Sequence, residues 1–259
     1  MKNARFFPRI GGFDLDAKLL ERGKTFLDFC CPDLDDALDI SDVVILATPV
    51  IEIVRILEQC IGKYPQKFYT DVGSCKTPMF EITGNYPHVR FIGGHPIAGS
   101  ENKGESGWDP SLFEKKTYFY TCDNNQFSRD LEMLKDMIES VGAIPYSISP
   151  SIHDRSVALT SHLPLLASYG LMATYSDNNL DLNTFIGSGF RSMTRLTGGS
   201  PEMGKDMLIS NRENILTELD NYRAELDCLA ECLKNKDEKK LLELMQKQNK
   251  LYWQKIKEE

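Results

Sequence analysis

Two glycine-rich segments of this 259-residue chain carry side chains suited to acid–base chemistry. The first reads T-D-V-G-S-C-K over residues 70–76, and the second reads G-G-H-P-I-A-G-S-E over residues 93–101. A neutral imidazole such as that of His95 accepts a proton near pH 7, and the Ser74 hydroxyl can donate or accept a hydrogen bond. Taken alone, these residues leave a structural alternative open, in which His95 only caps its loop and Ser74 only forms a turn.

Two arginines in the second half of the chain could bind an acidic substrate. Arg191 and Arg195 lie in the segment G-S-G-F-R-S-M-T-R over residues 187–195. The planar guanidinium group binds a carboxylate through two parallel hydrogen bonds, which suits arginine to this task. The alternative for each arginine is an ion pair at the surface.

The segment R-I-G-G-F-D over residues 9–14 predicts a strand that ends in an acidic side chain. At such a strand end in a dinucleotide-binding unit, the carboxylate of Asp14 accepts both ribose hydroxyls of NAD and repels the 2′-phosphate of NADP. The alternative is that Asp14 caps the following helix. A buried strand predicted at residues 42–48 brings Thr48 and Pro49 to the carboxyl edge of the sheet, where ligands of open α/β sheets bind.

Short β-branched runs alternate with helical patterns over the first 150 residues, which is typical of a parallel sheet covered by helices. Strands are predicted at residues 9–14, 42–48, 67–71, 89–92, 116–120 and 143–146. Helices are predicted at residues 15–22, 50–60 and 126–141. In the last of these, Leu131, Leu134 and Ile138 recur at three- and four-residue spacing, so the helix presents one apolar face to a sheet.

After Pro150 the strand patterns end and helical patterns continue to the last residues. We therefore predict an α/β domain over residues 1–149 and an all-helical domain over residues 150–259. Helices are predicted at residues 152–175, 212–235 and 237–257. The first should be interrupted near Pro164, because proline lacks a backbone donor and clashes with the preceding turn. The last two form an amphipathic hairpin with more apolar surface than one small domain needs, so we expect a homodimer through them.

The composition excludes several classes of partner. A net charge of −8, with basic residues mixed among acidic ones, offers no surface for nucleic acid. No apolar run approaches the roughly 20 residues that span a bilayer, and the start lacks the apolar core of a secretory signal. We therefore expect no membrane contact and a cytoplasmic location. The seven cysteines form no paired C-x-x-C clusters, so no metal site is predicted.

Four segments, taken together, resemble the prephenate dehydrogenase family. In that family a T-D-x-G-S-x-K turn faces a G-G-H-P-x-A-G-[ST]-E loop, as residues 70–76 and 93–101 do here. Residues 149–164 resemble the family's entry into its helical domain, and residues 187–195 resemble its segment for the substrate carboxylate. The matches occur in the right order over residues 8–225. The resemblance implies a Rossmann-like, mostly parallel α/β domain followed by an all-α dimerisation domain.

This resemblance implies an NAD-dependent enzyme, with NADP less suited, that converts prephenate to 4-hydroxyphenylpyruvate, carbon dioxide and NADH in tyrosine biosynthesis. His95 would accept the proton of the ring hydroxyl, and Ser74 would hydrogen-bond both that hydroxyl and His95. Arg195 would bind a carboxylate of the dianionic substrate, with Arg191 as a weaker candidate. His162 would face the substrate from the helical domain, or else be a satisfied interdomain histidine.

Other residues in these segments have less definite roles. Glu101, with Ser100 beside it, could orient or gate the substrate, but a solvated loop acid is the alternative. His153 and Asp154 are interpreted as a cap at the start of a helix that orients the domain junction.

The sequence departs from the family pattern at three places. Leu165 stands where the family often has a second histidine, and Gly204 stands where it usually has tryptophan, so one polar contact and one aromatic wall are absent. No G-x-G-x-x-G turn precedes Asp14, although one normally lies roughly twenty residues before this acid. We therefore expect that the sequence begins after the first strand and the glycine-rich loop of the cofactor domain.

Two other functions stay open on the sequence alone. An arogenate dehydrogenase would use the same residues, because its substrate carries an amino group where prephenate has a keto group. A non-catalytic dimeric remnant would have lost cofactor binding together with the glycine-rich loop.

Overall fold

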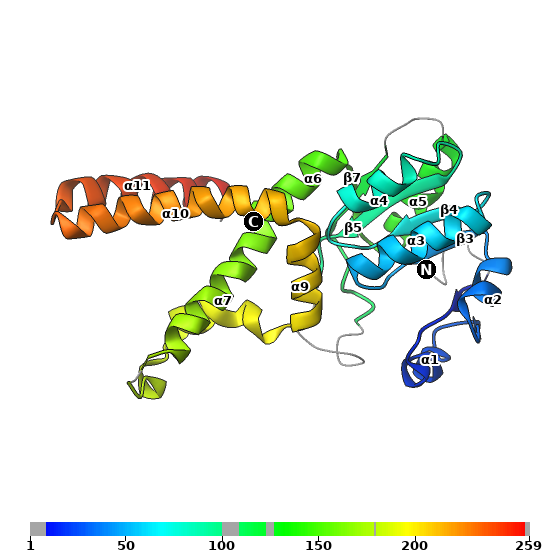
Figure 1. Ribbon diagram of the computed structural model, residues 1–259, viewed down its shortest axis with the longest axis horizontal. Helices are drawn as coiled ribbons and strands as arrows, with labels where there is room; N and C mark the ends of the chain where they lie inside the picture. The colour runs from blue at the N-terminus through cyan, green and yellow to red at the C-terminus, as the bar shows by residue number, and fades with distance from the viewer. Residues whose placement is uncertain (1–8, 100–108, 123–126, 179, 257–259) are drawn as a thin grey trace. The chain divides into compact units, whose positions relative to one another are not determined.

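The structure is a computed structural model that describes residues 9–99, 109–122, 127–178 and 180–256 (Figure 1). A central sheet contains, in spatial order, β3 (Val43–Leu46), β4 (Phe68–Asp71), β5 (Arg90–Pro96), β6 (Thr117–Thr121) and β7 (Ile144–Ser147). All neighbours are parallel except β5 and β6, which pair antiparallel with His95 opposite Phe119. The prediction of a mostly parallel sheet is confirmed.

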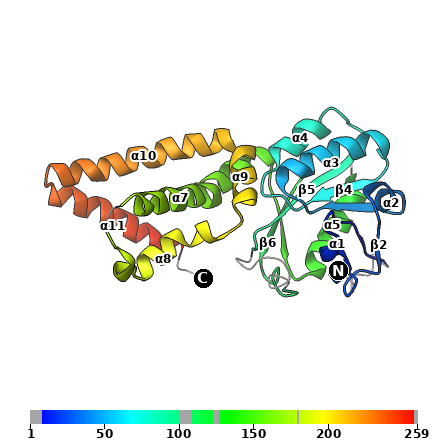
Figure 2. The ribbon, with the colours of Figure 1, turned by 60° about the horizontal axis from the view of Figure 1, so that its bottom comes forward.

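Three helices cover this sheet: α3 (Val50–Lys63), α4 (Thr77–Thr83) and α5 (Ser128–Ser140). Side chains alternate along each strand, so β4 and β5 each contribute to two cores. Tyr69 and Phe91 pack with α3 and α4 on one face, whereas Phe68 and Ile92 pack with α5 on the other. Figures 1 and 2 show α3 and α4 on the opposite side of the sheet from α5. Strand β4 and most of β5 are therefore covered on both faces, whereas Ile144 and Tyr146 of β7 are exposed.

A separate two-stranded sheet precedes the central one in the chain. β1 (Gly11–Gly12) and β2 (Phe29–Cys30) are parallel, and α1 (Ala17–Gly23) connects them. A Cβ atom on Gly11 would lie 2.2 Å from the Phe29 ring, so any larger residue at this position would have to displace that ring. The strand predicted at residues 9–14 contains only Gly11 and Gly12 in the structure. Neither β2 nor the following α2 (Leu34–Asp39) is predicted, because such short segments carry too little periodicity.

Between β7 and Arg212 the described chain is helical. Its elements are α6 (Pro150–Val157), the π-helical η3 (Ala158–His162), α7 (Leu163–Ser176), η4 (Asn183–Phe185), α8 (Ser188–Thr194), η5 (Arg195–Gly198) and α9 (Pro201–Ser210). The predicted helix at 152–175 is present as α6, η3 and α7. Its interruption is the π-helical segment that ends two residues before Pro164, where a wider turn accommodates a residue that cannot donate a hydrogen bond.

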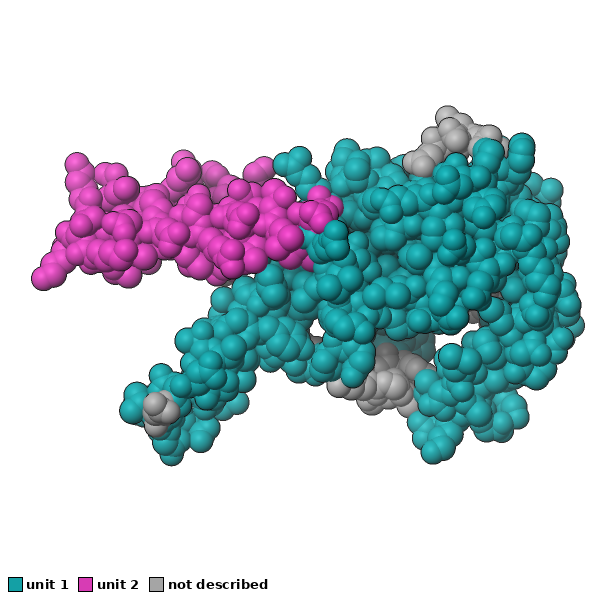
Figure 3. Space-filling model, viewed as in Figure 1, with its two compact units in different colours: residues 1–212 teal, residues 213–259 magenta. Residues whose placement is uncertain are grey.

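The structure divides into two compact units, residues 1–212 and residues 213–259 (Figure 3). The helices up to α9 therefore share a unit with the sheet, and the domain boundary at 149/150 stays a prediction. The second unit is a helical hairpin of α10 (Arg212–Lys234) and α11 (Glu238–Lys255), as the sequence predicts. Large apolar side chains on both helices are exposed: Leu226, Leu233, Leu242, Met245, Leu251 and Trp253. None of the helices in the described ranges is long and apolar enough to cross a membrane.

Candidate active site

A buried ion pair joins the two glycine-rich segments. Lys76 and Asp71 are both fully buried and form this pair, and Lys76 also donates to the Gly94 carbonyl oxygen at 2.5 Å. The Asp71 carboxylate accepts the backbone N–H of Gly94 at 3.0 Å. A Cβ atom on Gly94 would lie 2.5 Å from the Asp71 carbonyl oxygen, which explains the glycine. The pair therefore fixes the turn that carries Ser74 against the strand that carries His95.

His95 begins a chain of hydrogen bonds that ends on a buried carboxylate. Its Nδ1 lies 2.8 Å from Nε2 of His153 on α6. The His153 side chain is fully buried, and its Nδ1 lies 2.7 Å from Oδ1 of Asp154. The two imidazole rings meet edge to face, with 5.0 Å between their centroids. This arrangement holds the His95 ring in one orientation at the end of β5.

The carboxylate of Asp154 also ties α6 to the start of α4. Oδ1 accepts the backbone N–H of Lys76 at 2.7 Å, and Oδ2 accepts that of Thr77 at 2.8 Å. The prediction that His153 and Asp154 cap their own helix is wrong, because the Ser149 side chain makes the capping hydrogen bond of α6. Asp154 instead caps a helix that is distant in the sequence, and a local pattern carries no information about such a contact.

His162 lies fully buried in the π-helical segment. Its Nδ1 lies 3.1 Å from Nδ2 of Asn211, and the same amide nitrogen donates to the Asp154 carbonyl oxygen at 2.7 Å. Nε2 of His162 has no hydrogen-bond partner among the described residues. A buried nitrogen in this condition can serve a ligand. The five residues of this cluster are called the histidine network: His95, His153, Asp154, His162 and Asn211.

Burial keeps two imidazoles of the network neutral. It lowers the pKa of His95 well below 6.5, and the positive charge of Lys76 acts in the same direction. Burial also lowers the pKa of His162 to about 4, although Asp154 opposes this shift. Burial alone would raise the pKa of Asp154, but hydrogen bonds from His153 and from the start of α4 lower it below its usual value. At neutral pH the site therefore contains a carboxylate beside neutral imidazoles.

The remaining predicted substrate residues are less enclosed. Ser74 is half-buried, and no hydrogen bond within the described ranges joins it to His95. Arg195 is exposed at the start of η5, and Arg191 is exposed on α8. Two predicted residues lie outside the described part of the chain, namely Ser100 and Glu101. The roles of all these residues stay predictions.

Two of the three predicted cofactor residues line a large cavity. This cavity has a volume of about 1180 Å³ and extends along β1 and β3, with Asp14 and Thr48 in its wall. Asp14 is exposed and accepts the backbone N–H of Asp16, and it is the Asp16 side chain that caps α1. Pro49 is exposed at the start of α3. The alternative role for Asp14, as the cap of the following helix, is therefore wrong.

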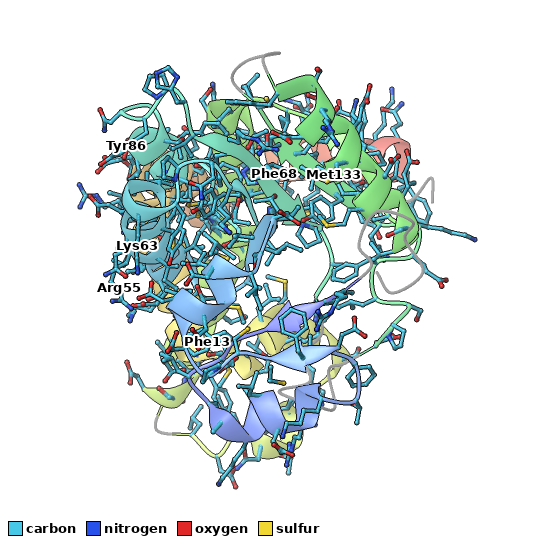
Figure 4. The ribbon with its side chains drawn as sticks, turned by 90° about the vertical axis from the view of Figure 1, so that its right-hand side faces the viewer. Phe13, Arg55, Lys63, Phe68, Tyr86 and Met133 are labelled. Atoms are coloured by element: carbon cyan, nitrogen blue, oxygen red, sulfur yellow. The ribbon has the colours of Figure 1, made fainter. Side chains whose placement is uncertain are left out.

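The cavity is bordered by the edges of two sheets. Among the described residues, β1 pairs only with β2, and β3 pairs only with β4. Residues Val43, Val44 and Ile45 of β3 are partly buried, whereas all four residues of β4 are buried. Figure 4 labels two residues of the cavity wall, Phe13 next to β1 and Met133 on α5. Strand β3 therefore presents apolar side chains to an open space.

The described residues contain no group of three or more His, Cys, Asp and Glu side chains that could hold a metal ion. The seven cysteines are free thiols. Burial raises the pKa of Cys60 to about 11 and that of Cys75 to about 12, so these thiols are protonated at neutral pH.

Three important contacts of this site join residues whose pairing is not apparent in the sequence. Asp71 and Lys76 stand in a recognisable motif, but their ion pair becomes apparent only when β4 lies beside β5. The contact of His153 with His95, and that of Asn211 with His162, join segments 58 and 49 residues apart. One signal in the sequence could have indicated the ion pair. Asp71 and Lys76 flank a glycine turn at the end of a buried strand, and buried charges need partners of opposite sign.

Two family models together match most of the chain. The model described as "Prephenate dehydrogenase, nucleotide-binding domain" matches residues 1–146, and "Prephenate dehydrogenase, dimerization domain" matches residues 149–247. This chain belongs to the prephenate dehydrogenase family. The family and the fold class predicted from the sequence are therefore confirmed.

Individual members of the prephenate dehydrogenase family agree with this assignment. The prephenate dehydrogenase of Bacillus subtilis (strain 168) is 31% identical over 205 residues, which are 76% of this chain and 55% of that protein. The chain thus spans about half the length of this relative. A crystal structure of prephenate dehydrogenase from A. aeolicus in complex with hydroxyphenyl propionate and NAD⁺ has a TM-score of 0.87 at 26% identity, covering 98% of this chain and 91% of that one. Synechocystis arogenate dehydrogenase has a TM-score of 0.76 at 29% identity, with 95% and 91% covered.

Proposed function

We propose that this chain oxidises prephenate with NAD and releases 4-hydroxyphenylpyruvate, carbon dioxide and NADH. The observation that carries the proposal is the buried chain from His95 through His153 to Asp154, which holds a neutral imidazole as a proton acceptor. Membership of the family supports it, as does the A. aeolicus relative, whose structure contains hydroxyphenyl propionate and NAD⁺.

The reaction needs a base beside the ring alcohol. His95 takes the hydroxyl proton while the ring carbon gives its hydride to the nicotinamide, and the alcohol becomes a carbonyl. The ring carboxylate then leaves as carbon dioxide, and the electron pair of the broken bond completes the aromatic ring. The former carbonyl oxygen becomes a phenol oxygen and recovers the proton from His95. Charges and atoms balance, and the base is regenerated.

Other side chains would hold the substrate. Arg195 binds one carboxylate of the dianion, because a guanidinium group makes two charge-assisted hydrogen bonds to it. His162 offers its unpartnered Nε2 to a substrate oxygen. Ser74 would hydrogen-bond the ring hydroxyl, and Glu101 with Ser100 would orient the substrate.

The cavity beside β1 and β3 fits a dinucleotide. Its volume of about 1180 Å³ exceeds the roughly 300–1,000 Å³ of small-molecule pockets. The exposed carboxylate of Asp14 would accept the ribose hydroxyls and repel a 2′-phosphate, which favours NAD over NADP. Thr48 and Pro49 would contact the cofactor at the carboxyl end of β3. When bound, NAD supplies the hydride acceptor for the reaction.

Arogenate is the second candidate substrate, since one similar structure is that of an arogenate dehydrogenase. The two substrates differ in a side-chain amino or keto group, whereas the ring chemistry at His95 is the same. The ratio of kcat/KM for prephenate and arogenate decides between them. We expect the larger value for prephenate.

The family description of residues 149–247 as a dimerization domain supports a homodimer. We propose that it forms through the exposed apolar side chains of α10 and α11. Light scattering should show twice the mass of 29.4 kDa. A location in the cytoplasm stays a prediction from the sequence.

The proposed activity is tested by mixing the purified chain with prephenate and NAD and following NADH absorbance and 4-hydroxyphenylpyruvate. We expect both products in equal amounts. His95→Asn should lower kcat by roughly 10²- to 10⁴-fold, the usual effect of losing acid–base assistance.

The matched control is His88→Asn, because His88 is exposed in a turn away from the network. It should keep the full rate. If wild type and His95→Asn turn over equally, His95 is not the base. If the wild type gives no NADH and calorimetry detects no NAD binding, the non-catalytic remnant is the better description.

A further inference from the structure

Asp154 is connected to two imidazoles of the histidine network by different groups. Its carboxylate reaches His95 through His153, and its carbonyl oxygen is held by Asn211, which also contacts His162. We propose that Asp154 is a positioning residue that sets opposite tautomers, with Nε2 unprotonated on His95 and protonated on His162. The catalytic meaning of these tautomers rests on the proposed function, whereas the tautomers themselves do not.

The first arm of the network is the connection from the Asp154 carboxylate through His153 to His95, and it determines which nitrogen of His95 carries the hydrogen. The carboxylate of Asp154 only accepts hydrogen bonds, so the proton on Nδ1 of His153 points to it. With one ring hydrogen, placed on Nδ1, His153 has a lone pair on Nε2, and this atom lies 2.8 Å from Nδ1 of His95. Two lone pairs cannot form this contact, so Nδ1 of His95 carries the hydrogen. Nε2 of His95 is therefore left as an acceptor.

The second arm is the connection from the Asp154 carbonyl oxygen through Asn211 to His162, and it determines which nitrogen of His162 carries the hydrogen. A carbonyl oxygen only accepts, so the amide group that faces the Asp154 carbonyl at 2.7 Å is the NH₂ end of Asn211. The same nitrogen lies 3.1 Å from Nδ1 of His162 and donates its second hydrogen there. Because burial keeps this imidazole neutral at neutral pH, its hydrogen is on Nε2. That N–H is buried and unpartnered among the described residues.

Opposite tautomers suit the two tasks that the reaction sets. The acceptor on His95 can take the hydroxyl proton, and the donor on His162 can bind a carboxylate or carbonyl oxygen of the same substrate. The reverse arrangement would put a donor where the base is needed. A buried N–H donor without an acceptor is unfavourable. A substrate oxygen that accepts a hydrogen bond from Nε2 of His162 should therefore be bound favourably. Substrate binding would relieve this cost.

Side-chain ¹⁵N–¹H correlation spectra of the full chain at pH 7 read these tautomers directly without substrate. The sequence has four histidines, and the exposed His88 is assigned by the His88→Asn variant. We expect His95 and His153 protonated on Nδ1 and His162 protonated on Nε2. His95 protonated on Nε2, or His162 protonated on Nδ1, overturns the proposal.

Asp154→Asn tests the first arm in catalysis. It should lower kcat by roughly 10²- to 10⁴-fold, comparable with the effect of a wrong tautomer in other enzymes. The acid limb of the pH profile should also move to lower pH, because Asp154 is the group that raises the pKa of His95. Lys76, His153 and His162 all lower this pKa and remain in the variant.

A purely structural role for Asp154 would reduce the amount of folded protein without moving the pH profile. Asp136→Asn is the matched control, because Asp136 is exposed on α5. It should change neither kcat nor the acid limb. An unchanged acid limb in folded Asp154→Asn overturns the first arm.

Asn211→Asp tests the second arm by replacing the donor with an acceptor. His162 should then carry its hydrogen on Nδ1, and KM for the substrate should rise roughly 10- to 100-fold with a smaller change in kcat. The control is Asn221→Asp on α10, an exposed asparagine changed in the same way. An unaltered His162 tautomer in folded Asn211→Asp contradicts the assignment.

The two proposals fail in different ways. If the spectra show the expected tautomers but no prephenate is oxidised, the function is wrong and the tautomer assignment survives. If prephenate is oxidised but the tautomers are reversed, only the assignment is wrong.

Discussion

The two sides of the proposed site are built very differently. On the substrate side, His153, Asp154 and His162 are at most 1% exposed, and hydrogen bonds link them across β5, α6 and the π-helical segment. On the cofactor side, Asp14 and Thr48 are exposed in the wall of a cavity that runs along two edge strands. The acid–base groups are therefore held by the fold before any ligand binds. The cofactor side has few such constraints.

This difference follows from what each side has to do. A base and its tautomer depend on fixed neighbours, because pKa and hydrogen-bond direction change with small displacements. A dinucleotide is bound through many contacts along its length, so no single side chain has to be placed as exactly. Substitutions on the buried side should therefore have larger effects than substitutions on the open side.

The largest change in stability should come from breaking the buried ion pair between Lys76 and Asp71. Lys76→Met leaves the Asp71 carboxylate buried without its cation, and breaking a buried pair in this way destabilises a protein by roughly 3–5 kcal/mol. Urea denaturation would show the lower free energy of unfolding.

Two controls sharpen this result. Adding Asp71→Asn to Lys76→Met removes both charges and should recover much of the loss. Lys63→Met breaks an exposed pair with Asp35 and should change stability far less, because water and salt screen exposed charges. Equal losses for Lys63 and Lys76 would show that burial does not distinguish the two pairs.

Stability should also fall in acid through His162. Its pKa is about 4 in the folded protein and 6.5 ordinarily, so the unfolded chain binds this proton more readily. The contribution is fully present above pH 6.5 and is lost as the pH falls through 4, roughly 3 kcal/mol in all. Within this environment His153 also lowers the pKa of His162, and Asp154 raises it.

His162→Gln should therefore lose less stability than the wild type between pH 7 and pH 4.5 in urea denaturation. His88→Gln, an exposed control, should follow the wild type. Parallel curves for wild type and His162→Gln would mean that His162 titrates as an ordinary histidine.

A moderate effect is expected at the exposed Arg195. Arg195→Ala should raise KM for prephenate roughly 10- to 100-fold and leave kcat nearly unchanged, because a charge-assisted hydrogen bond contributes to binding in both ground and transition state. Initial rates over a range of prephenate concentrations measure this. Arg191→Ala should have a weaker effect, and the opposite order would move the carboxylate site to Arg191.

The smallest effect is expected on the open side. Asp14→Asn should weaken NAD binding about tenfold or less and improve the relative use of NADP, because the charge that repels a 2′-phosphate is gone. Calorimetric titration with both cofactors measures this. Asp16→Asn is the neighbouring control, because that side chain caps α1. A loss of NAD affinity as large as the effect of His95→Asn on turnover would erase the contrast between the two sides.

Regular periodicity was sufficient to predict the long elements. α3 repeats buried Val50, Ile53, Leu57 and Ile61 at three- and four-residue spacing, and α10 and α11 match their predicted ranges closely. The short β2, α2 and α4 lack such a repeat. The cap of α4 could not be predicted either, because Asp154 is 77 residues from Thr77.

The sequence by itself determined the family, the order of the elements, and the presence of His95, His162 and Arg195 in recognisable segments. Only the tertiary structure decided that Asp154 supports both imidazoles and that Lys76 is buried against Asp71. The physical reason is that side-chain type and local periodicity are properties of neighbouring residues. Burial, pKa and tautomer depend on groups that chain folding brings together from distant segments.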